Sequence, residues 1–165
     1  MSEPRWLDAR EQQIWRAFLA AVGLLSERLD RELQRDAGMP HTYYEILVVL
    51  SEAPGRALRM SELAQLVRSS RSRLSHAVAR LEEAGWLRRQ PCPTDKRGCF
   101  AVLTDEGFAV LEAAAPGHVE GVRRHLFDVL TPAQVTQLGQ ISAAIRDGLC
   151  PERARPSRAE PSAPC

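Results

Sequence analysis

The chain has 165 residues and a mass of 18.4 kDa, and 44% of its residues are hydrophobic and 26% charged, an ordinary balance for one globular domain. Its longest nearly uncharged apolar stretch, residues 17–25, falls far short of the roughly 20 residues of a membrane-spanning helix. The first twenty residues mix charged with apolar side chains, so we expect no secretory signal, no membrane partner, and a cytoplasmic protein whose four cysteines stay reduced.

Basic residues are concentrated in the middle of the chain. Residues 56–97 contain ten Arg and Lys against four Asp and Glu, a net charge of +6 in a chain whose total is +1. A cationic segment inside an otherwise acidic protein is typical of a surface that contacts phosphate groups. A solvated charged face without a ligand is the alternative that charge alone leaves open.

Two helices are predicted before this basic segment. Apolar residues recur at intervals of three, four and seven between Asp8 and Arg35, which predicts a long amphipathic helix with Asp8 as its N-cap and Gly38 beyond its end. Residues 42–52 predict a shorter and more apolar helix, which the Pro54-Gly55 pair ends.

The basic segment itself predicts two helices and a hairpin. The expected elements are a helix at 61–67 capped by Ser61, a helix at 71–84 ended by Gly85, and strands at 86–90 and 99–103. A tight polar turn joins the helices, and the strands flank a tip rich in Pro, Gly and charge. This succession predicts a winged helix-turn-helix.

Further helices are predicted after the hairpin. Thr104 is a suitable N-cap for a helix running towards Leu130, which Pro116-Gly117 should kink or interrupt. Thr131-Pro132 begins a last helix that extends to Leu149. Residues 150–165 are rich in Pro, Arg, Ser and Ala without apolar periodicity, and we expect them to be disordered.

The second helix of a winged helix-turn-helix enters the major groove of DNA by its N-terminal residues. The expected DNA contacts of this recognition helix are Arg71, Ser72, Arg73, Ser75 and His76. Leu74, Val78 and Leu81 lie on the opposite face and should be buried. A solvated helix start is the alternative for the two arginines, and a partly exposed surface group is the alternative for His76.

The hairpin tip supplies a second set of expected DNA contacts, Asp95, Lys96 and Arg97. Arg97 can enter the minor groove, whose negative potential attracts a guanidinium group, while Asp95 holds that group in place. An ordinary exposed ion pair is the alternative.

These residues together resemble a known family. The run SELAQLVRSSRSRLSHAVARLEEAGWLRRQPCPTDKRGCFAVLTDEG, preceded by a long helix and GMPHTYYEILVVL, is similar to the MarR family of transcriptional regulators over roughly residues 8–149. The resemblance implies a homodimer with interlocking first and last helices on a pseudo-palindromic double-stranded DNA operator. It places Ser72, Arg73, Ser75 and His76 at base-reading positions, and Asp95 and Arg97 in the wing. Many relatives have Arg where this chain has His76, and Cys99 is an unusual residue for the wing strand.

The resemblance also implies release of DNA by a small aromatic or phenolic ligand, or by cysteine oxidation. The candidate ligand contacts are Trp15, Arg16, Tyr43, Tyr44 and His118. Packing in the core is the alternative for the aromatic residues. Cys92 and Cys99 flank the wing tip and could pair in a redox-sensing regulator, but two unrelated reduced thiols are the favoured interpretation. No metal site or cofactor is expected, because the cysteines and histidines lack a zinc-site spacing.

The predicted fold class is therefore mainly α with a small β-hairpin wing, a winged helix-turn-helix with long N- and C-terminal dimerisation helices. The predicted domains are an N-terminal dimerisation helix at 1–38, a DNA-binding lobe at 39–104, C-terminal dimerisation helices at 105–149 and the tail at 150–165. The terminal helices carry more apolar residues than a monomer could bury, namely Leu7, Phe18, Leu126, Phe127, Leu130, Leu138, Ile141 and Ile145.

The predicted function is a sequence-specific, ligand-responsive DNA-binding regulator, and more specifically a repressor. A helical adaptor that uses the same fold for protein partners is the alternative, against which the basic segment argues. An enzyme is not expected, because the sequence has no Gly-rich phosphate loop, no paired carboxylates at a plausible cleft and no nucleophile elbow, and no residue is assigned a catalytic role.

Overall fold

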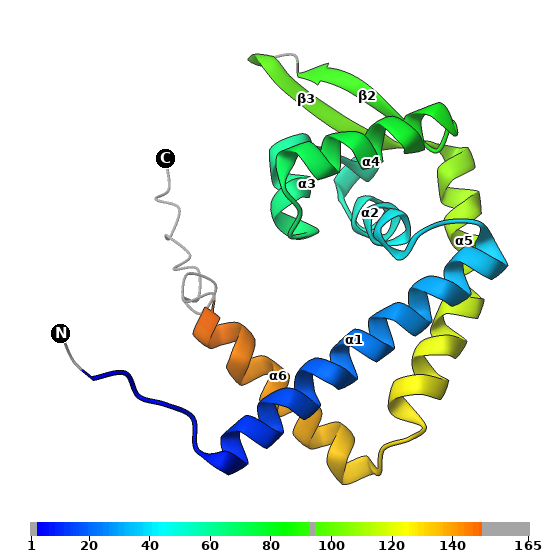
Figure 1. The fold of residues 1–165 in the computed structure, drawn as a ribbon. Coiled ribbons are helices and arrows are strands. Elements are labelled where there is room, and N and C mark those ends of the chain that lie inside the picture. Colours follow the sequence, from blue (N-terminus) through cyan, green and yellow to red (C-terminus); the bar gives the residue numbers. More distant parts are fainter. Residues whose placement is uncertain (1–2, 93–94, 150–165) are drawn as a thin grey trace, which may run out of the picture. The chain divides into compact units, whose positions relative to one another are not determined.

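A computed structural model describes residues 3–92 and 95–149, with the backbone alone at 95–97. The chain forms two compact units, residues 1–123 and residues 124–165. The helices are α1 (Ala9–Ala37), α2 (His41–Ser51), α3 (Met60–Leu66), α4 (Arg71–Glu83), α5 (Asp105–Val122) and α6 (Pro132–Leu149), and the strands are β1 (Ala57–Arg59), β2 (Leu87–Cys92) and β3 (Asp95–Leu103) (Figure 1). The first unit holds α1 to α5 and the sheet, and the second holds α6. The expected mainly α fold with a small wing is confirmed.

The long first helix begins and ends where its capping residues predict. The Asp8 carboxylate accepts a hydrogen bond from the Glu11 backbone N–H at 2.7 Å, and the Glu11 carboxylate accepts one from the Asp8 N–H at 2.9 Å. This reciprocal capping box satisfies two N–H groups that the helix leaves unpaired. At the other end Gly38 adopts φ +64°, and its N–H donates to the Gln34 carbonyl, which ends α1 in a left-handed cap.

One hydrophobic core fills the first unit between the helices and the sheet. Its largest fully buried side chains are Met39, Ile46, Leu47, Leu50, Leu63, Leu74, Val78, Leu81 and Leu87. The three α4 residues in this set are those expected to face inward, so that prediction is confirmed. Burial of such side chains is the main source of stability for a domain of this size, at about 1.5–3 kcal/mol each.

The sheet has one strand more than the sequence predicts. Strand order is β1-β3-β2 with both pairs antiparallel, and β1 pairs Leu58 with Ala101 of β3. A strand of three residues is too short to show an alternating pattern in the sequence. It is therefore recognised only by its pairing with β3. Strands β2 and β3 also extend further towards the tip than expected, with Pro91 opposite Cys99.

One predicted cap is wrong, and the predicted interruption of a helix at Pro116 is not observed. Ser61 does not cap α3, because the helix begins at Met60 directly after β1, and its N-cap Arg59 makes no side-chain capping bond. Pro116 does not interrupt α5, which continues to Val122 before a π-helical turn at residues 123–127. Proline has no backbone N–H and therefore cannot donate the helical hydrogen bond to the carbonyl four residues earlier, here that of Glu112. Glu112 and Pro116 are both exposed, so water can satisfy that carbonyl.

The predicted caps of α5 and α6 are present, and α4 has a cap that the sequence interpretation missed. The Ser70 hydroxyl accepts from the Arg73 N–H at the start of α4, and the Thr104 hydroxyl accepts from the Gly107 N–H at the start of α5. In the second unit, Thr131 and Gln134 cap α6 reciprocally. The predicted tail at 150–165 lies outside the described residues.

Candidate nucleic-acid interface

The connection between α3 and α4 is a tight turn. Its backbone is closed by a hydrogen bond from the Ser69 N–H to the Ala64 carbonyl at 3.0 Å. Arg68 adopts the left-handed conformation, with φ +49°, which is uncommon for a residue with a side chain. The turn brings the N-terminal end of α4 to the surface beside α3, as a helix-turn-helix requires.

The two faces of α4 have different chemistry. All five predicted DNA contacts, Arg71, Ser72, Arg73, Ser75 and His76, are exposed on the N-terminal half of the helix. Leu74, Ala77, Val78 and Leu81 on the other face are buried in the core. The exposed side chains are therefore available to a ligand while the buried ones hold the helix in place.

Several cations of this surface have no acidic partner. Within the part of the chain whose side chains are described, no ion pair engages Arg68, Arg71 or Arg73. Further along α4, Arg80 pairs with Glu83 at 2.8 Å. The uncompensated positive charge is thus concentrated at the turn and the start of α4, where an anion would also be favoured by the helix dipole.

Arg89 on β2 is a residue of this surface that the sequence interpretation missed. Its guanidinium donates to the Ser75 carbonyl of α4 at 2.9 Å and lies 3.5 Å from the Glu82 carboxylate. Its backbone N–H also donates to Glu82, at 2.9 Å. These contacts tie the first wing strand to the recognition helix. No local sequence signal predicts them, because they join positions seven and fourteen residues apart.

The predicted wing contacts Asp95, Lys96 and Arg97 lie at the tip of β3, where Asp95 pairs with Cys92 of β2. Their side chains lie outside the described part of the structure. The expected support of the Arg97 guanidinium by Asp95 therefore stays a prediction.

Cys92 and Cys99 are not joined in a disulfide. Cys92 is buried, with its Sγ 3.2 Å from a guanidinium nitrogen of Arg59, and Cys99 is half-buried and lines the space beside α4. Pro91 pairs directly with Cys99, and neighbouring residues of a strand point to opposite faces. The register thus gives no support to a disulfide across the hairpin.

The predicted ligand contacts do not form one cluster. The Tyr44 and His118 rings are 4.4 Å apart, and the His41 ring, which the sequence interpretation missed, is 5.4 Å from that of His118. Trp15 and Arg16 are exposed on α1, more than three helical turns before Leu29, or about 20 Å along the helix. Tyr43 lines a separate hollow with Arg73 and His76 of α4.

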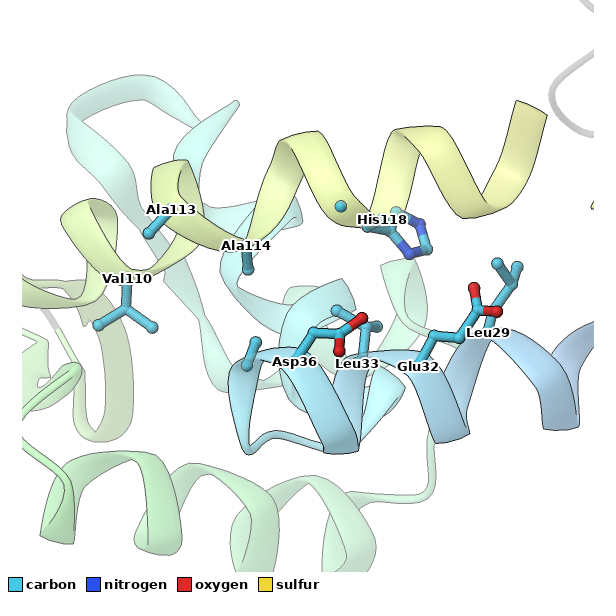
Figure 2. A pocket seen from close by; sticks show the side chains of 10 residues that line it. Leu29, Glu32, Leu33, Asp36, Val110, Ala113, Ala114 and His118 are labelled. Atoms are coloured by element: carbon cyan, nitrogen blue, oxygen red, sulfur yellow. The ribbon is translucent and has the colours of Figure 1, made fainter. Parts of the chain in front are cut away.

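A cavity of about 220 Å³ lies beside His118, between α1 and α5 (Figure 2). It is lined by Leu29, Glu32, Leu33, Asp36, Ala37, Val110, Ala113, Ala114, Gly117 and His118. The Nδ1 atom of His118 is buried and has no hydrogen-bond partner among the described residues. An apolar cavity with a few polar groups is typical of a small-molecule site, and a buried polar atom without a partner is uncommon in proteins.

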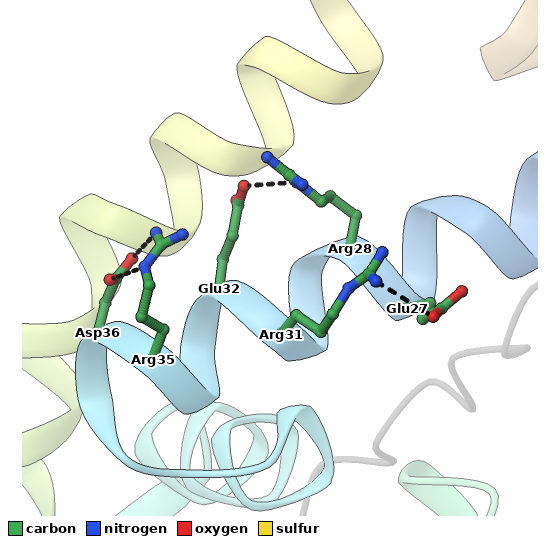
Figure 3. Close-up of polar contacts among 6 residues, drawn as sticks. All are labelled: Glu27, Arg28, Arg31, Glu32, Arg35 and Asp36. Atoms are coloured by element: carbon green, nitrogen blue, oxygen red, sulfur yellow. Dashed lines mark hydrogen bonds and ion pairs between the residues drawn. The ribbon is translucent and has the colours of Figure 1, made fainter.

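The acidic groups of the cavity are engaged by arginines of α1. Glu32 accepts from Arg28 at 2.9 Å, and Asp36 pairs with Arg35 at 2.6 Å, next to a third pair between Glu27 and Arg31 (Figure 3). Glu32 is buried and packs against Gly121 of α5, where an added Cβ would lie 2.7 Å from its Oε2 atom. The absence of a side chain at Gly121 therefore lets α1 and α5 approach closely.

Burial lowers the pKa of His118, and electrostatic repulsion with the nearby His41 lowers it further. Burial raises the pKa of the Tyr44 hydroxyl. Both groups are therefore neutral at pH 7, and the unpaired nitrogen of His118 can act as a hydrogen-bond donor or acceptor according to its tautomer.

Among the residues whose side chains are described, 3–92 and 98–149, no three His, Cys, Asp or Glu are grouped to hold a metal ion. None of the helices described is long and apolar enough to cross a membrane.

The helix-turn-helix, the wing and the exposed cationic start of α4 define a winged-helix protein, and comparison with known proteins identifies its family. The model of the MarR family matches residues 37–98. The regulator PecS of Dickeya dadantii is 34% identical over 116 residues, which cover 69% of this chain and 67% of PecS. The chain belongs to the MarR family, whose members are transcriptional regulators and not enzymes.

Two solved structures extend this similarity over most of the chain. Sco3205, a MarR family transcriptional regulator from Streptomyces coelicolor solved in complex with DNA, is 57% identical, with a TM-score of 0.85 and 97% of each chain covered. AbsC, another MarR family regulator from the same organism, is 44% identical, with a TM-score of 0.82 and coverage of 88% of this chain and 98% of AbsC.

Proposed function

We propose that this protein is a sequence-specific DNA-binding repressor that binds a pseudo-palindromic operator as a homodimer. The observation that carries the proposal is the exposed N-terminal half of α4, where Arg71 and Arg73 have no acidic partner among the described side chains. The DNA complex of the 57% identical Sco3205 supports it.

The recognition helix would read bases with the side chains at its start. Arg73 and His76 can both donate hydrogen bonds to guanine, while Ser72 and Ser75 can accept or donate. Arg97 at the wing tip would contact the adjacent minor groove through its charge. The reading helix and the wing are held to one another by the contacts of Arg89 with Ser75 and Glu82, so both would meet the duplex in a fixed relation.

A second copy of the chain would cover the exposed apolar residues of the terminal helices. On α1 these include Ile14, Trp15, Phe18, Leu19 and Val22, and on α6 Ile141, Ile145 and Leu149, each at least 45% exposed. Such apolar area is typical of a protein interface. In the resulting dimer the two α4 helices would lie about 34 Å apart and would read half-sites about 10 base pairs apart.

The cavity beside His118 would hold the ligand that releases DNA. Its apolar walls suit a small aromatic molecule, and His118 Nδ1 would bind a phenolic hydroxyl. A ligand between α1 and α5 would change the position of α5. This movement would reach the DNA-binding lobe, because the Thr104 hydroxyl at the start of α5 donates to the Gly85 carbonyl at the end of the recognition helix at 2.8 Å.

The proposed function is tested by substitutions at the start of α4. Arg73→Ala or His76→Ala should weaken binding to the preferred duplex by about 1–3 kcal/mol and relax base choice at one position. The duplex is selected from a random pool with the wild-type protein, and affinities are then measured by fluorescence anisotropy at fixed salt. Arg80→Ala is the matched control, because Arg80 is exposed on the same helix but outside its N-terminal half.

Two results would contradict the proposal. If the wild-type protein does not shift random DNA even at low salt, the adaptor function becomes the better explanation. If both substitutions behave like Arg80→Ala in affinity and base preference, α4 is not the reading element.

His118 should make stability depend on pH. Because the folded-state pKa lies below its unfolded value of about 6.5, the unfolded chain binds the proton more readily, and stability should fall as the pH drops from about 6.5 towards the folded-state pKa. His118→Gln should therefore reduce the loss of stability between pH 7 and pH 5.5, measured by urea unfolding. An equal pH dependence in the wild type and in His118→Gln would contradict the assignment.

A further inference from the structure

The cavity between α1 and α5 carries negative charge on its lining. Glu32 and Asp36 are its charged groups, and among the described residues that line it none is a lysine or an arginine. The ion-pair partners of these carboxylates, Arg28 and Arg35, also belong to α1 but are not part of the lining. The formal charges nearest to a bound molecule would therefore be negative.

Glu32 has more influence on the cavity than Asp36. It is buried, and its carboxyl group points from α1 towards α5 and the His118 ring (Figure 2). The Asp36 side chain is about half exposed, so water screens its charge. Because charges interact more strongly where water is excluded, the Glu32 carboxylate dominates the electrostatics of the cavity.

His118, the third polar group of the lining, does not compensate this charge. Burial lowers its pKa, so its ring is neutral at pH 7. A carboxylate can only accept hydrogen bonds, whereas a neutral imidazole nitrogen accepts or donates according to its tautomer. A ligand that binds to Glu32 must therefore supply the hydrogen-bond donor itself.

The volume of the cavity limits the size of the ligand. It measures about 220 Å³, and an apolar cavity of about 150 Å³ holds one benzene molecule. Leu29, Leu33 and Val110 provide apolar surface for a ring. The cavity thus has room for a single ring with one or two small substituents.

We propose that Glu32 makes this cavity select its ligands by charge, so that it binds single-ring compounds with a neutral or cationic hydrogen-bond donor and excludes aromatic carboxylates. The inference rests on the proposed function, in which this cavity holds the ligand that releases DNA. An aromatic carboxylate would leave water to lie beside the buried Glu32, without a cation in the described lining. Two carboxylates at one buried site repel each other. An amide, a phenol or an ammonium group binds the same acceptor without this repulsion.

The experiment compares three compounds of similar shape, using the full chain without DNA. Benzamide is neutral, benzylamine is cationic at pH 7, and benzoate is anionic. Affinities are obtained from the rise of the melting temperature with ligand concentration. We expect benzamide and benzylamine to bind at millimolar concentration. Benzoate should bind at least about tenfold more weakly than benzamide, because like charges repel strongly at short distance.

The role of Glu32 is tested by Glu32→Gln, which removes the charge and keeps the shape of the side chain. In this variant the preference for benzamide over benzoate should fall by about tenfold. A purely structural effect would weaken all three compounds together and leave the preference unchanged. Glu27→Gln is the matched control, because Glu27 lies on the same helix and pairs with Arg31 outside the cavity (Figure 3). It should keep the wild-type preference, and melting without ligand checks the fold of both variants.

Three results would overturn the inference. They are equal affinities of the wild type for benzoate and benzamide, no binding of any of the three compounds at millimolar concentration, and a preference that Glu32→Gln leaves unchanged. Failure of the proposed function gives a different result. Compounds that bind with the expected preference but do not weaken binding to the selected duplex would contradict ligand-induced release of DNA and would still support selection by charge.

Discussion

Substitution of Gly107 by alanine should destabilise the protein by about 3 kcal/mol or more. Gly107 lies in the first turn of α5, and an added Cβ would be 2.1 Å from the Trp86 carbonyl oxygen and 2.9 Å from a methyl carbon of Leu103. Because the nearest atom belongs to the backbone, a side-chain rotation cannot relieve the overlap. Overpacking of a core usually costs about 1–3 kcal/mol, and more where the backbone must move.

The effect is measured as the free energy of unfolding in urea. Gly117→Ala provides the matched control, because Gly117 lies in the same helix and its added Cβ would have no atom within 4 Å. This control should be neutral or should stabilise the protein by up to about 1 kcal/mol, since alanine favours a helix more than glycine does. A Gly107→Ala protein within about 0.5 kcal/mol of the wild type would show that the contact between α5 and Trp86 is not tightly packed.

Substitution of Phe18 by aspartate should convert the proposed dimer into a monomer. Phe18 is 45% exposed in the single chain, and its ring lies 6.3 Å from that of Trp15, so both would be covered by the second copy. An unpaired carboxylate inside an apolar interface is strongly unfavourable. Sedimentation at micromolar concentration should therefore give a mass near 18.4 kDa for the variant and twice that mass for the wild type.

Loss of the dimer should also reduce the affinity for a duplex with two half-sites by about a hundredfold or more, because two linked lobes bind as one unit. Gln13→Asp adds the same charge to an exposed position on nearly the opposite side of α1 and should leave both mass and affinity unchanged. A wild-type protein that sediments as a monomer would remove the basis of the prediction. A dimeric Phe18→Asp protein would show that α1 does not form the interface.

Local signals in the sequence predict much of the fold. The Asp8 cap and the Gly38 cap define where α1 begins and ends, and each depends on residues a few positions apart. Strand β1 could not be predicted in this way, since three residues acquire their extended form from pairing with β3. The continuation of α5 through Pro116 depends on solvent exposure, which the sequence does not specify.

The same distinction applies to the candidate sites. The exposed positions of α4 follow from helical periodicity, so the five predicted DNA contacts share one surface. Arg89 was missed because its partners come from another element. Tyr44 and His118 are 74 residues apart and meet only in the folded chain, whereas Trp15 has a suitable side chain but lies elsewhere on α1. Residue type suggests a ligand contact, and only tertiary packing brings such residues together.

The two faces of α4 bear on how DNA-binding preference can change during evolution. Stability depends on the buried residues Leu74, Val78 and Leu81, whereas the side chains at the exposed positions of α4 contribute little to the core. Arg89 contacts the carbonyl of Ser75 and not its side chain, so even this tie does not constrain the residue type at position 75. Substitutions on the exposed face can therefore accumulate at little cost in stability, and duplicated genes with this scaffold could acquire new operator sequences without compensating changes in the core.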